Sequence, residues 1–373
     1  MHPLFFMGYV CGNINLHPYK LITIIMKNFK NNFILGLSLL LISTSVLRAQ
    51  EEETEEKPTF NFSGTVDTYF RSSFSEDPVA PATSFGDLNG FALGMANFIV
   101  SYEGEKSGFV ADAVFGPRGS NAVFGSVRGS FDDPGYGFSS EILNQLYVYY
   151  NIAEGVTVTL GNFNTFLGYE VISPAANFNY STSYMFSYGP FSHTGLKVDF
   201  SITEDISLML GVFNQTDQTE ANYDRYTAFG AQLGLYGQYI NFLGGDGYAQ
   251  IDFTGGLDLS DSFFLGLNAT TASLEGDTGF SGVALYPQLT VSDGFAIGLR
   301  GEFFSETDGF GALVSDGDAD NFSLTLTGSF TSGNFIFKPE FRIDSASSEI
   351  FAISPTETAD SLSSFLVAAI YSF

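Results

Sequence analysis

Apolar and polar side chains alternate along the chain from residue 60 to its last residue. In the segment 335–343, FIFKPEFRI, every odd position but one is Phe or Ile, and Lys338, Glu340 and Arg342 stand between them. Successive side chains of a β-strand point to opposite faces of the sheet. The pattern therefore predicts a strand with one apolar face and one charged face.

The same signal recurs sixteen times as about ten residues of alternation followed by a turn or a loop. No stretch of this region keeps a 3.6-residue period, so we expect almost no helix in it. The predicted strands cover residues 60–70, 91–103, 109–117, 142–152, 156–163, 196–203, 206–214, 227–236, 238–244, 248–257, 262–271, 280–291, 295–304, 321–330, 335–343 and 364–373.

The connections between these strands alternate between short and long. The short ones contain turn residues and lie at 104–106, 153–155, 204–205, 236–237, 260–261, 292–294 and 331–334. The longer ones lie at 71–90, 118–141, 164–193, 215–226, 272–279, 305–320 and 344–363, and the short GDG at 245–247 is the exception. Tight turns on one side and loops on the other are typical of a membrane β-barrel, whereas a soluble sandwich has no reason to separate them.

The hydrocarbon interior of a membrane requires the sheet to close on itself. In hydrocarbon every backbone N–H and C=O needs a partner within the protein, so a spanning sheet must form a ring. A tilted strand of about ten residues crosses the apolar layer, which matches the predicted segments. We predict an all-β fold, an antiparallel up-and-down transmembrane β-barrel of about 16 strands, which is wide enough for an aqueous channel.

Charged residues inside the predicted strands share the inward register, and no position assigned to the outward register carries a charge. An Arg or Lys that faces lipid at mid-depth costs roughly 2–4 kcal/mol, which explains the exclusion. The predicted pore-lining residues are Asp67, Glu103, Asp112, Lys197, Asp199, Asp252, Arg300, Glu302, Lys338, Glu340 and Arg342.

The N-terminus carries an export signal. From Met26 the chain reads MKNFKNNFILGLSLLLISTSVLRAQ, in which an apolar run of 11 residues follows two lysines and Ala49 is a candidate cleavage point. The run is too short to span a bilayer as a helix, so we expect a removable signal peptide. We divide the chain into an N-terminal extension and cleaved signal peptide (1–49, with Met26 a candidate start), an acidic leader (50–59) and an outer-membrane β-barrel (60–373).

Composition narrows the classes of function. The 373 residues carry a net charge of −27, with 41 acidic and 14 basic side chains. We expect no nucleic-acid partner, because phosphates would be repelled. Removal of residues 1–49 leaves no cysteine, so packing or a closed sheet must hold the exported chain in place of disulfides.

Two motif fragments bear on chemistry. DGDAD at 316–320 resembles the start of a calcium loop, but Asn321 stands at the required Gly and Thr327 at the required Glu. Ser192 and His193 are adjacent in sequence, whereas a catalytic triad is a spatial arrangement. Because the chain has no G-x-S-x-G elbow, phosphate loop or zinc motif, we predict no enzymatic activity, catalytic residue, cofactor or metal site. A barrel lipase is retained only as an alternative.

The connection 164–193 has an unusual composition. It is rich in Tyr, Phe, Asn and Ser and carries one charge, Glu170. Because so much aromatic surface is unfavourable in solvent, we predict that the loop folds into the barrel and narrows the pore. Packing over the mouth, or against a neighbouring subunit, stays open as an alternative. The predicted constriction residues are Glu170, Asn177, Asn179, Tyr180, Tyr184, Phe191 and His193.

The segment 168–195 resembles the signature loop of the OmpL-like β-barrel porins of Gram-negative outer membranes. The resemblance is carried by Ser173-Pro174, Asn177, Asn179-Tyr180-Ser181, Pro190-Phe191 and His193-Thr194-Gly195, followed at once by a strand. It implies a passive diffusion channel, but no particular solute. The terminal strand ends in Phe373, which resembles the C-terminal signature that outer-membrane assembly machinery reads.

Together these features predict a porin of a Gram-negative outer membrane, a passive diffusion channel for small hydrophilic solutes. Acidic side chains dominate the wall and the loops, which favours a mild cation preference. The expected partners are outer-membrane lipid, small hydrophilic solutes or ions, and the barrel-assembly machinery, and a homotrimer is left open. The alternatives are a non-conducting barrel that acts as an adhesin or surface protein, and a soluble exported β-sandwich.

Overall fold

The computed structural model describes residues 58–75, 78–79, 81, 83, 85–86, 89–123, 142–219, 227–245 and 247–373. The predicted signal peptide and nearly all of the acidic leader lie outside the described residues, so their boundaries stay predictions.

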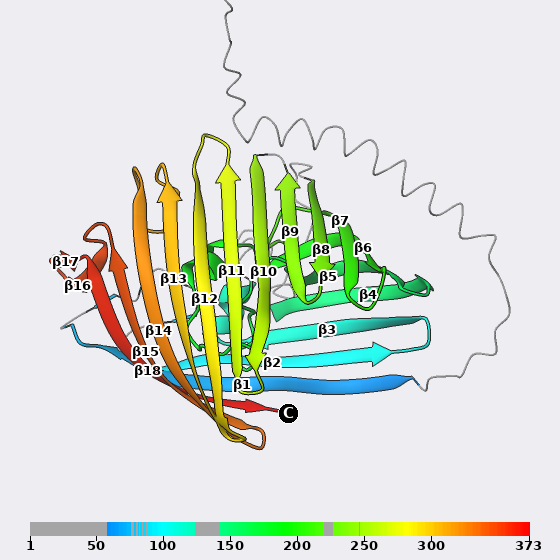
Figure 1. Cartoon of the computed structure of the whole chain (residues 1–373), viewed down its shortest axis with the longest axis horizontal. Helices are drawn as coiled ribbons and strands as arrows, with labels where there is room; N and C mark the ends of the chain where they lie inside the picture. Colours follow the sequence, from blue (N-terminus) through cyan, green and yellow to red (C-terminus); the bar gives the residue numbers. More distant parts are fainter. Residues whose placement is uncertain are drawn as a thin grey trace, which may run out of the picture. The chain divides into compact units, whose positions relative to one another are not determined.

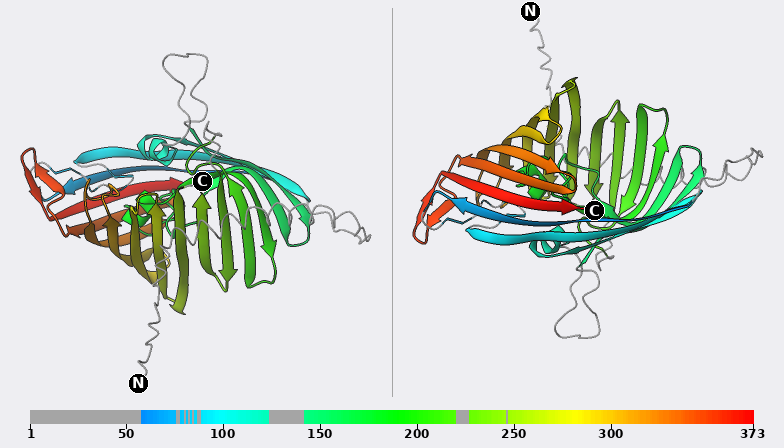
Figure 2. Two further views of the ribbon diagram at one scale, coloured as in Figure 1. Left: turned by 90° about the horizontal axis from the view of Figure 1, so that it is seen from above. Right: turned by 90° about the horizontal axis from the view of Figure 1, so that it is seen from below.

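Sixteen antiparallel strands close into one barrel (Figure 1), as the alternation predicts. The barrel strands are β1 (Thr59–Ser73), β2 (Gly90–Glu103), β3 (Ser107–Phe115), β4 (Leu143–Ala153), β5 (Val156–Asn164), β6 (Ser192–Ser201), β7 (Ile206–Phe213), β8 (Ala228–Leu235), β9 (Gln238–Gly245), β10 (Tyr248–Ser260), β11 (Phe263–Leu274), β12 (Gly279–Ser292), β13 (Phe295–Thr307), β14 (Ala319–Ser332), β15 (Phe335–Ala346) and β18 (Ser361–Ser372). Neighbours in sequence pair with one another, and β1 pairs with β18 to complete the ring (Figure 2). The ring leaves no strand edge unpaired, which satisfies the demand of hydrocarbon on the backbone.

The alternation predicts the barrel strands but not the secondary structure within the connections between them. A separate two-stranded sheet of β16 (Phe351–Ser354) and β17 (Glu357–Ala359) lies between β15 and β18 in sequence. Within the described part of the chain, helix is limited to α2 (Pro117–Ala122), α3 (Tyr184–Tyr188) and one residue in a 3₁₀ conformation, Ile142. The predicted near-absence of helix is therefore confirmed. Neither helix is long and apolar enough to cross a membrane.

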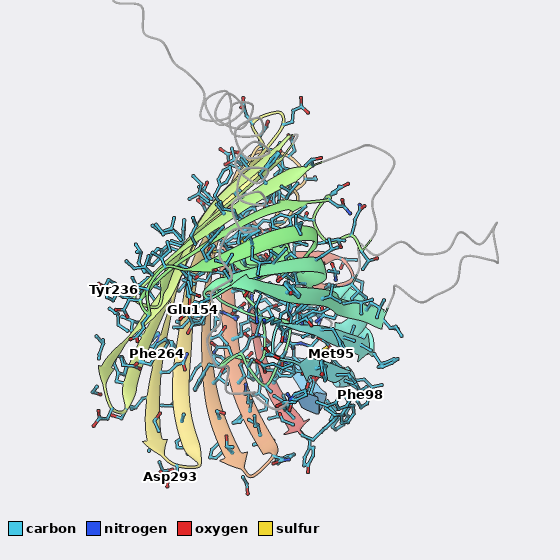
Figure 3. The ribbon with its side chains drawn as sticks, turned by 90° about the vertical axis from the view of Figure 1, so that its right-hand side faces the viewer. Met95, Phe98, Glu154, Tyr236, Phe264 and Asp293 are labelled. Carbon is cyan, nitrogen blue, oxygen red and sulfur yellow. The ribbon has the colours of Figure 1, made fainter. Side chains whose placement is uncertain are left out.

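The two faces of the sheet differ as the pattern requires. On β15 the side chains of Phe337, Phe341 and Ile343 lie on the exposed face, whereas Lys338 and Arg342 lie on the buried one. Met95 and Phe98 show the same contrast on β2, since Met95 is buried and Phe98 is more than one third exposed (Figure 3).

Both prolines inside strands lie where pairing with one neighbour is interrupted. Pro287 pairs with Leu265 of β11 but is skipped in the register between β12 and β13. Pro339 pairs with Val367 of β18 but is skipped in the register between β14 and β15. Proline has no N–H to give to a ladder, so the break falls on the side where a donor would be required.

The long connections all lie at one end of the barrel, together with two short ones, from β9 to β10 and from β11 to β12, and the opposite end has short turns. Seven turns of two to four residues join β2 to β3, β4 to β5, and so on to β14 and β15. Glu154, Tyr236 and Asp293 lie in three of them (Figure 3). Gly64 and Phe373, near the two ends of the barrel segment, exchange backbone hydrogen bonds of 3.0 Å at this same end. We call it the turn side, and the opposite end the loop side.

Candidate pore and its inner loop

Residues 165–191, which join β5 to β6, lie against the inner wall of the barrel, and we call them the inner loop. Tyr180 and Tyr184 of this loop are fully buried, although they belong to a connection rather than to the sheet. The loop hydrogen-bonds to wall residues on β1, β10, β13, β14 and β15.

Basic wall residues bind carbonyl groups of the inner loop. Arg300 on β13 donates from Nη1 to the carbonyl of Ser181 at 2.5 Å and from Nη2 to that of Thr182 at 3.2 Å. Arg342 on β15 donates to the same Thr182 carbonyl at 2.8 Å. Lys338 Nζ donates to the carbonyl of Pro174 at 2.9 Å and also to that of Asn177.

Acidic wall residues bind the backbone amides of the same segment. Glu340 accepts from the N–H groups of Tyr180, at 2.8 Å, and Ser181, at 3.1 Å. Glu302 accepts from those of Tyr184, at 2.9 Å, and Met185, at 2.8 Å. A buried backbone group without a partner is costly, so these charged side chains take the role that a neighbouring strand has in a sheet.

The buried charges are themselves compensated. Arg300 forms an ion pair of 2.6 Å with Glu170, the one charged residue predicted for the loop. Arg342 pairs with Asp344 at 2.7 Å, and its guanidinium lies 5.5 Å from the ring centre of Tyr184. Such pairing is needed here, because an isolated charge in this environment would carry a large desolvation penalty.

Glycines in the wall provide room for the aromatic side chains of the inner loop. A Cβ at Gly298 would overlap the ring of Phe178, and one at Gly266 would lie 2.5 Å from the Tyr169 hydroxyl. The freed space lets Tyr169 stack on Tyr286 of β12, with ring centres 4.2 Å apart. These glycines therefore form a seat for the loop.

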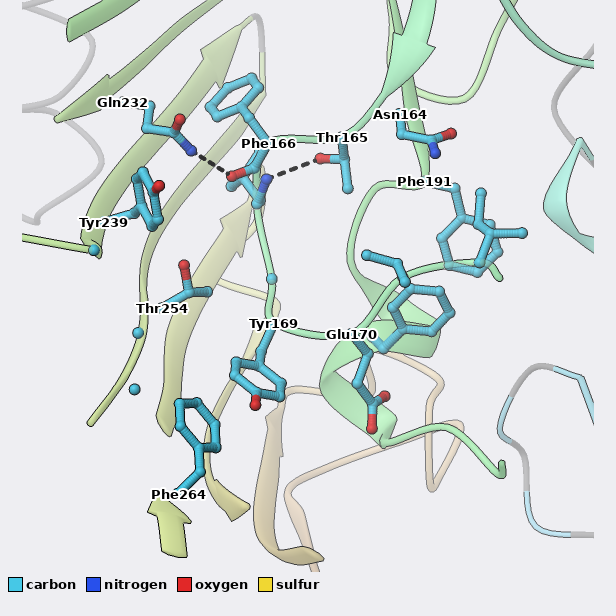
Figure 4. A pocket seen from close by; sticks show the side chains of 18 residues that line it. Asn164, Thr165, Phe166, Tyr169, Glu170, Phe191, Gln232, Tyr239, Thr254 and Phe264 are labelled. Atoms are coloured by element: carbon cyan, nitrogen blue, oxygen red, sulfur yellow. Dashed lines mark hydrogen bonds between the residues drawn. The ribbon is translucent and has the colours of Figure 1, made fainter. Parts of the chain in front are cut away.

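Two cavities remain beside the inner loop, toward the turn side. The aromatic cavity has a volume of about 420 Å³ and is lined by Phe166, Tyr169, Tyr239 and Phe264 among others (Figure 4). The polar cavity, of about 560 Å³, is lined on its polar side by Glu103, Tyr147, Tyr149, Lys197 and Asp199. Both cavities contact Phe166 and Gln232, whose Nε2 donates to the Phe166 carbonyl at 3.0 Å.

A third cavity of about 300 Å³ lies near the end of the chain. It contacts Asp112, whose carboxylate accepts from Asn97 at 3.3 Å and from Asn144 at 2.7 Å. Within the described part of the chain, no three His, Cys, Asp or Glu side chains come together in a way that could hold a metal ion.

The structure separates the predicted pore-lining residues into two groups. Three of them, Glu103, Lys197 and Asp199, border the polar cavity. The other eight have side chains no more than 4 % exposed, namely Asp67, Asp112, Asp252, Arg300, Glu302, Lys338, Glu340 and Arg342. All of the eight except Asp112 bind the inner loop, so in this structure the loop covers them.

The predicted constriction residues are all buried, with exposed fractions of 7 % or less, namely Glu170, Asn177, Asn179, Tyr180, Tyr184, Phe191 and His193. Asn179 donates to Thr327 Oγ1 at 2.7 Å, whereas Asn177 binds Val171 within the loop. His193 belongs to β6, and its ring lies between those of Phe166 and Phe213, with centres 5.1 and 5.0 Å away.

Two residues outside the predicted set, both in connections between barrel strands, also bind the inner loop. Asp217, in the connection after β7, accepts from the N–H groups of Phe191, at 2.6 Å, and Ser192, at 2.9 Å. Arg118 of α2 donates to the carbonyls of Ile172, at 3.0 Å, and Tyr180, at 3.3 Å. Neither lies on an alternating segment, so the sequence pattern contains no signal for them.

A closed barrel with charged side chains inside, apolar ones outside and a long loop folded into the lumen defines the class of outer-membrane barrels to which porins belong. The family model described as "Putative beta-barrel porin-2, OmpL-like" matches residues 59–373, and the chain belongs to this family.

Solved structures resemble the fold. OmpT of Vibrio cholerae in its trimer form has a TM-score of 0.54 at 10% identity, covering 85% of this chain and 100% of that one. The anion-selective porin from Comamonas acidovorans has a TM-score of 0.50 at 12% identity, with the same coverage of 85% and 100%. At these identities the likeness concerns the fold alone. No curated protein matches the chain.

Proposed function

We propose that the protein is a porin of a Gram-negative outer membrane, through which small hydrophilic solutes diffuse passively. Membership of a porin family supports this function, as does a sixteen-stranded ring of the size that encloses an aqueous channel. The observation that carries the proposal is the pair of cavities beside the inner loop, since they give water and small solutes a place along the wall.

In this proposal the solute path runs along β2 to β11. The inner loop covers the wall formed by β13 to β15. Arg300, Lys338 and Glu340 of this wall hold the loop in place through hydrogen bonds to its backbone. Residues of the polar and aromatic cavities then form the exposed part of the path, with Glu103, Lys197 and Asp199 as its charged groups.

We also propose a modest preference for cations. Two carboxylates and one ammonium border the polar cavity, and the whole chain carries a net charge of −27. A wall and mouth with excess negative charge raise the local concentration of cations and lower that of anions.

Planar-bilayer recordings of the purified barrel test the proposal. We expect stepwise openings in KCl, and a reversal potential in a KCl gradient that has the sign of a cation-selective pore. A reversal potential of the opposite sign would exclude the cation preference while leaving the porin.

One observation favours the non-conducting alternative, an adhesin or surface protein. The inner loop is anchored at many points and its aromatic residues are buried, so it fills much of the lumen. Bilayers that stay silent at all voltages, with correctly folded protein, would support this alternative and exclude the channel.

Further partners belong to the same proposal. The barrel-assembly machinery would read β18 with its terminal Phe373, and lipid would surround the apolar outer face. Phe62 and Phe98 lie beside Phe373 on this face, with ring centres 5.6 and 6.0 Å from it. We leave the homotrimer as a hypothesis that size measurements in detergent can test.

A further inference from the structure

One end of the polar cavity is formed by Glu103 and Tyr149, close to the turn side. Glu103 is opposite Gly108 in the pairing of β2 with β3, and Gly108 is opposite Tyr149 in the pairing of β3 with β4. A Cβ at Gly108 would overlap the Tyr149 phenol, so this ring lies across the glycine on the side of Glu103. A carboxylate and an aromatic ring therefore adjoin each other at the cavity border.

The charge of Glu103 has no basic partner among the residues that the structure describes. The nearest basic residue in sequence, Lys106, forms an ion pair of 3.9 Å with Glu105. Lys197 is reached by following these pairs across two more strands. Tyr149 of β4 is opposite Thr159 of β5, and Thr159 is opposite Lys197 of β6. Strands are about 4.8 Å apart, so four spacings, roughly 19 Å, separate Glu103 from Lys197 along the wall.

The opposite end of the cavity shows how this chemistry holds an ammonium group. Lys197 Nζ binds Asp199 at 2.7 Å and lies 5.5 Å from the ring centre of Phe163. A primary ammonium is thus held between a carboxylate and an aromatic ring, an arrangement that combines ion pairing with attraction to the ring face. Glu103 and Tyr149 offer the same two groups without an ammonium of the protein.

We propose that Glu103 and Tyr149 form a binding subsite for small alkylammonium ions, in which the ammonium lies between the Glu103 carboxylate and the Tyr149 ring, as the Lys197 ammonium lies between Asp199 and Phe163. Because it names a solute class for the path described above, this inference rests on the proposed channel. A neutral alcohol of the same length lacks the charge that the carboxylate requires, so the subsite discriminates against it.

The test uses the folded full-length barrel in detergent, with n-butylammonium chloride as the probe and n-butanol as its neutral counterpart. Ligand-detected NMR titrations measure equilibrium binding without any need for conduction. We expect saturable binding of n-butylammonium and none of n-butanol. The substitution Glu103→Gln should weaken binding about tenfold or more, because it removes a charge-assisted hydrogen bond. Tyr149→Leu should weaken it about threefold.

Glu154→Gln is the matched control, since it removes a carboxylate from a neighbouring turn that does not border the cavity. It should leave binding unchanged. Equal binding of both probes, or unchanged binding in Glu103→Gln, would overturn the subsite. Silent bilayers with intact binding would exclude the proposed channel but keep the subsite, whereas conduction without saturable binding would exclude the subsite alone.

Discussion

Asp217 shows how a single carboxylate can fix the end of a long loop. It adopts a left-handed backbone conformation, with φ of 63°, which places its side chain at the first residues of β6. Burial raises its pKa from 3.8 to about 6, although the hydrogen bonds from the amides of Ser192 and Phe191 oppose the shift. Between pH about 4 and 6 the folded protein therefore holds a proton that the unfolded chain has released.

Stability should rise as the pH falls through this window, because the raised pKa penalises the ionised form in the folded state alone. We expect the wild-type barrel to gain of the order of 1 kcal/mol from Asp217 between pH 8 and pH 5. Asp217→Asn should be at least as stable at pH 8 and should lose this part of the pH dependence. Thermal unfolding in detergent, followed by circular dichroism, measures both. Asp261→Asn in an exposed turn is the control, and parallel pH profiles of wild type and Asp217→Asn would contradict the prediction.

At the scale of residues, the sequence predicts which face of a strand a side chain lies on better than it predicts what that side chain contacts. A period of two shows that Lys338, Glu340 and Arg342 share a face, and the structure places them on the same inner wall. It does not show what covers that wall, because the covering segment is a loop without a period. The contacts of Asp217 and Arg118 are missed for the same reason, since they depend on how loops meet in three dimensions.

At the scale of elements, strands are predicted well because each one has to satisfy lipid on one side over its whole length. The largest differences occur where a strand extends past its apolar stretch, as when β6 starts at Ser192 and β18 at Ser361. The hairpin of β16 and β17 lies beyond the barrel strands, where no lipid enforces alternation. Glycines inside strands, such as Gly298, are the only sequence feature that points to the place where the loop packs on the wall. A glycine in the sequence does not reveal which aromatic ring occupies the space beside it.

Gly298 offers a test of that seat. A methyl group at this position would collide with the ring of Phe178, so Gly298→Ala should displace the inner loop locally and lower stability by about 1–3 kcal/mol. Gly301→Ala on the same strand is the matched control, because its Cβ would meet only one atom, at 3.9 Å, and should change stability by less than about 0.5 kcal/mol. Thermal unfolding compares the two variants, and equal stabilities would show that the loop does not depend on this seat.

At the scale of the whole molecule, the barrel wall and the inner loop stabilise each other inside the lumen. The ring needs its wall charges compensated, and the loop supplies carbonyls, amides and Glu170 to compensate them. In return the wall fixes a segment that would otherwise expose its aromatic rings. The polar and aromatic cavities leave open space beside the inner loop along β2 to β11.

Deletion of residues 172–188 should therefore raise single-channel conductance, because it removes the covering segment from the wall of β13 to β15. Deletion of residues 351–359, which contain the hairpin of β16 and β17, is the control and should leave the conductance unchanged. A fall or no change in conductance after the first deletion would place the inner loop outside the conduction path.

The same deletion makes a second, independent prediction about selectivity. The wall that it uncovers carries three basic side chains, Arg300, Lys338 and Arg342, and three acidic ones, Glu302, Glu340 and Asp344. Because these charges balance, the reversal potential in a KCl gradient should move little while the conductance rises, with any change toward cations owing to Asp67 and Asp252. A strong shift toward anions would mean that the basic side chains dominate the uncovered wall, and that their compensation comes from the loop alone.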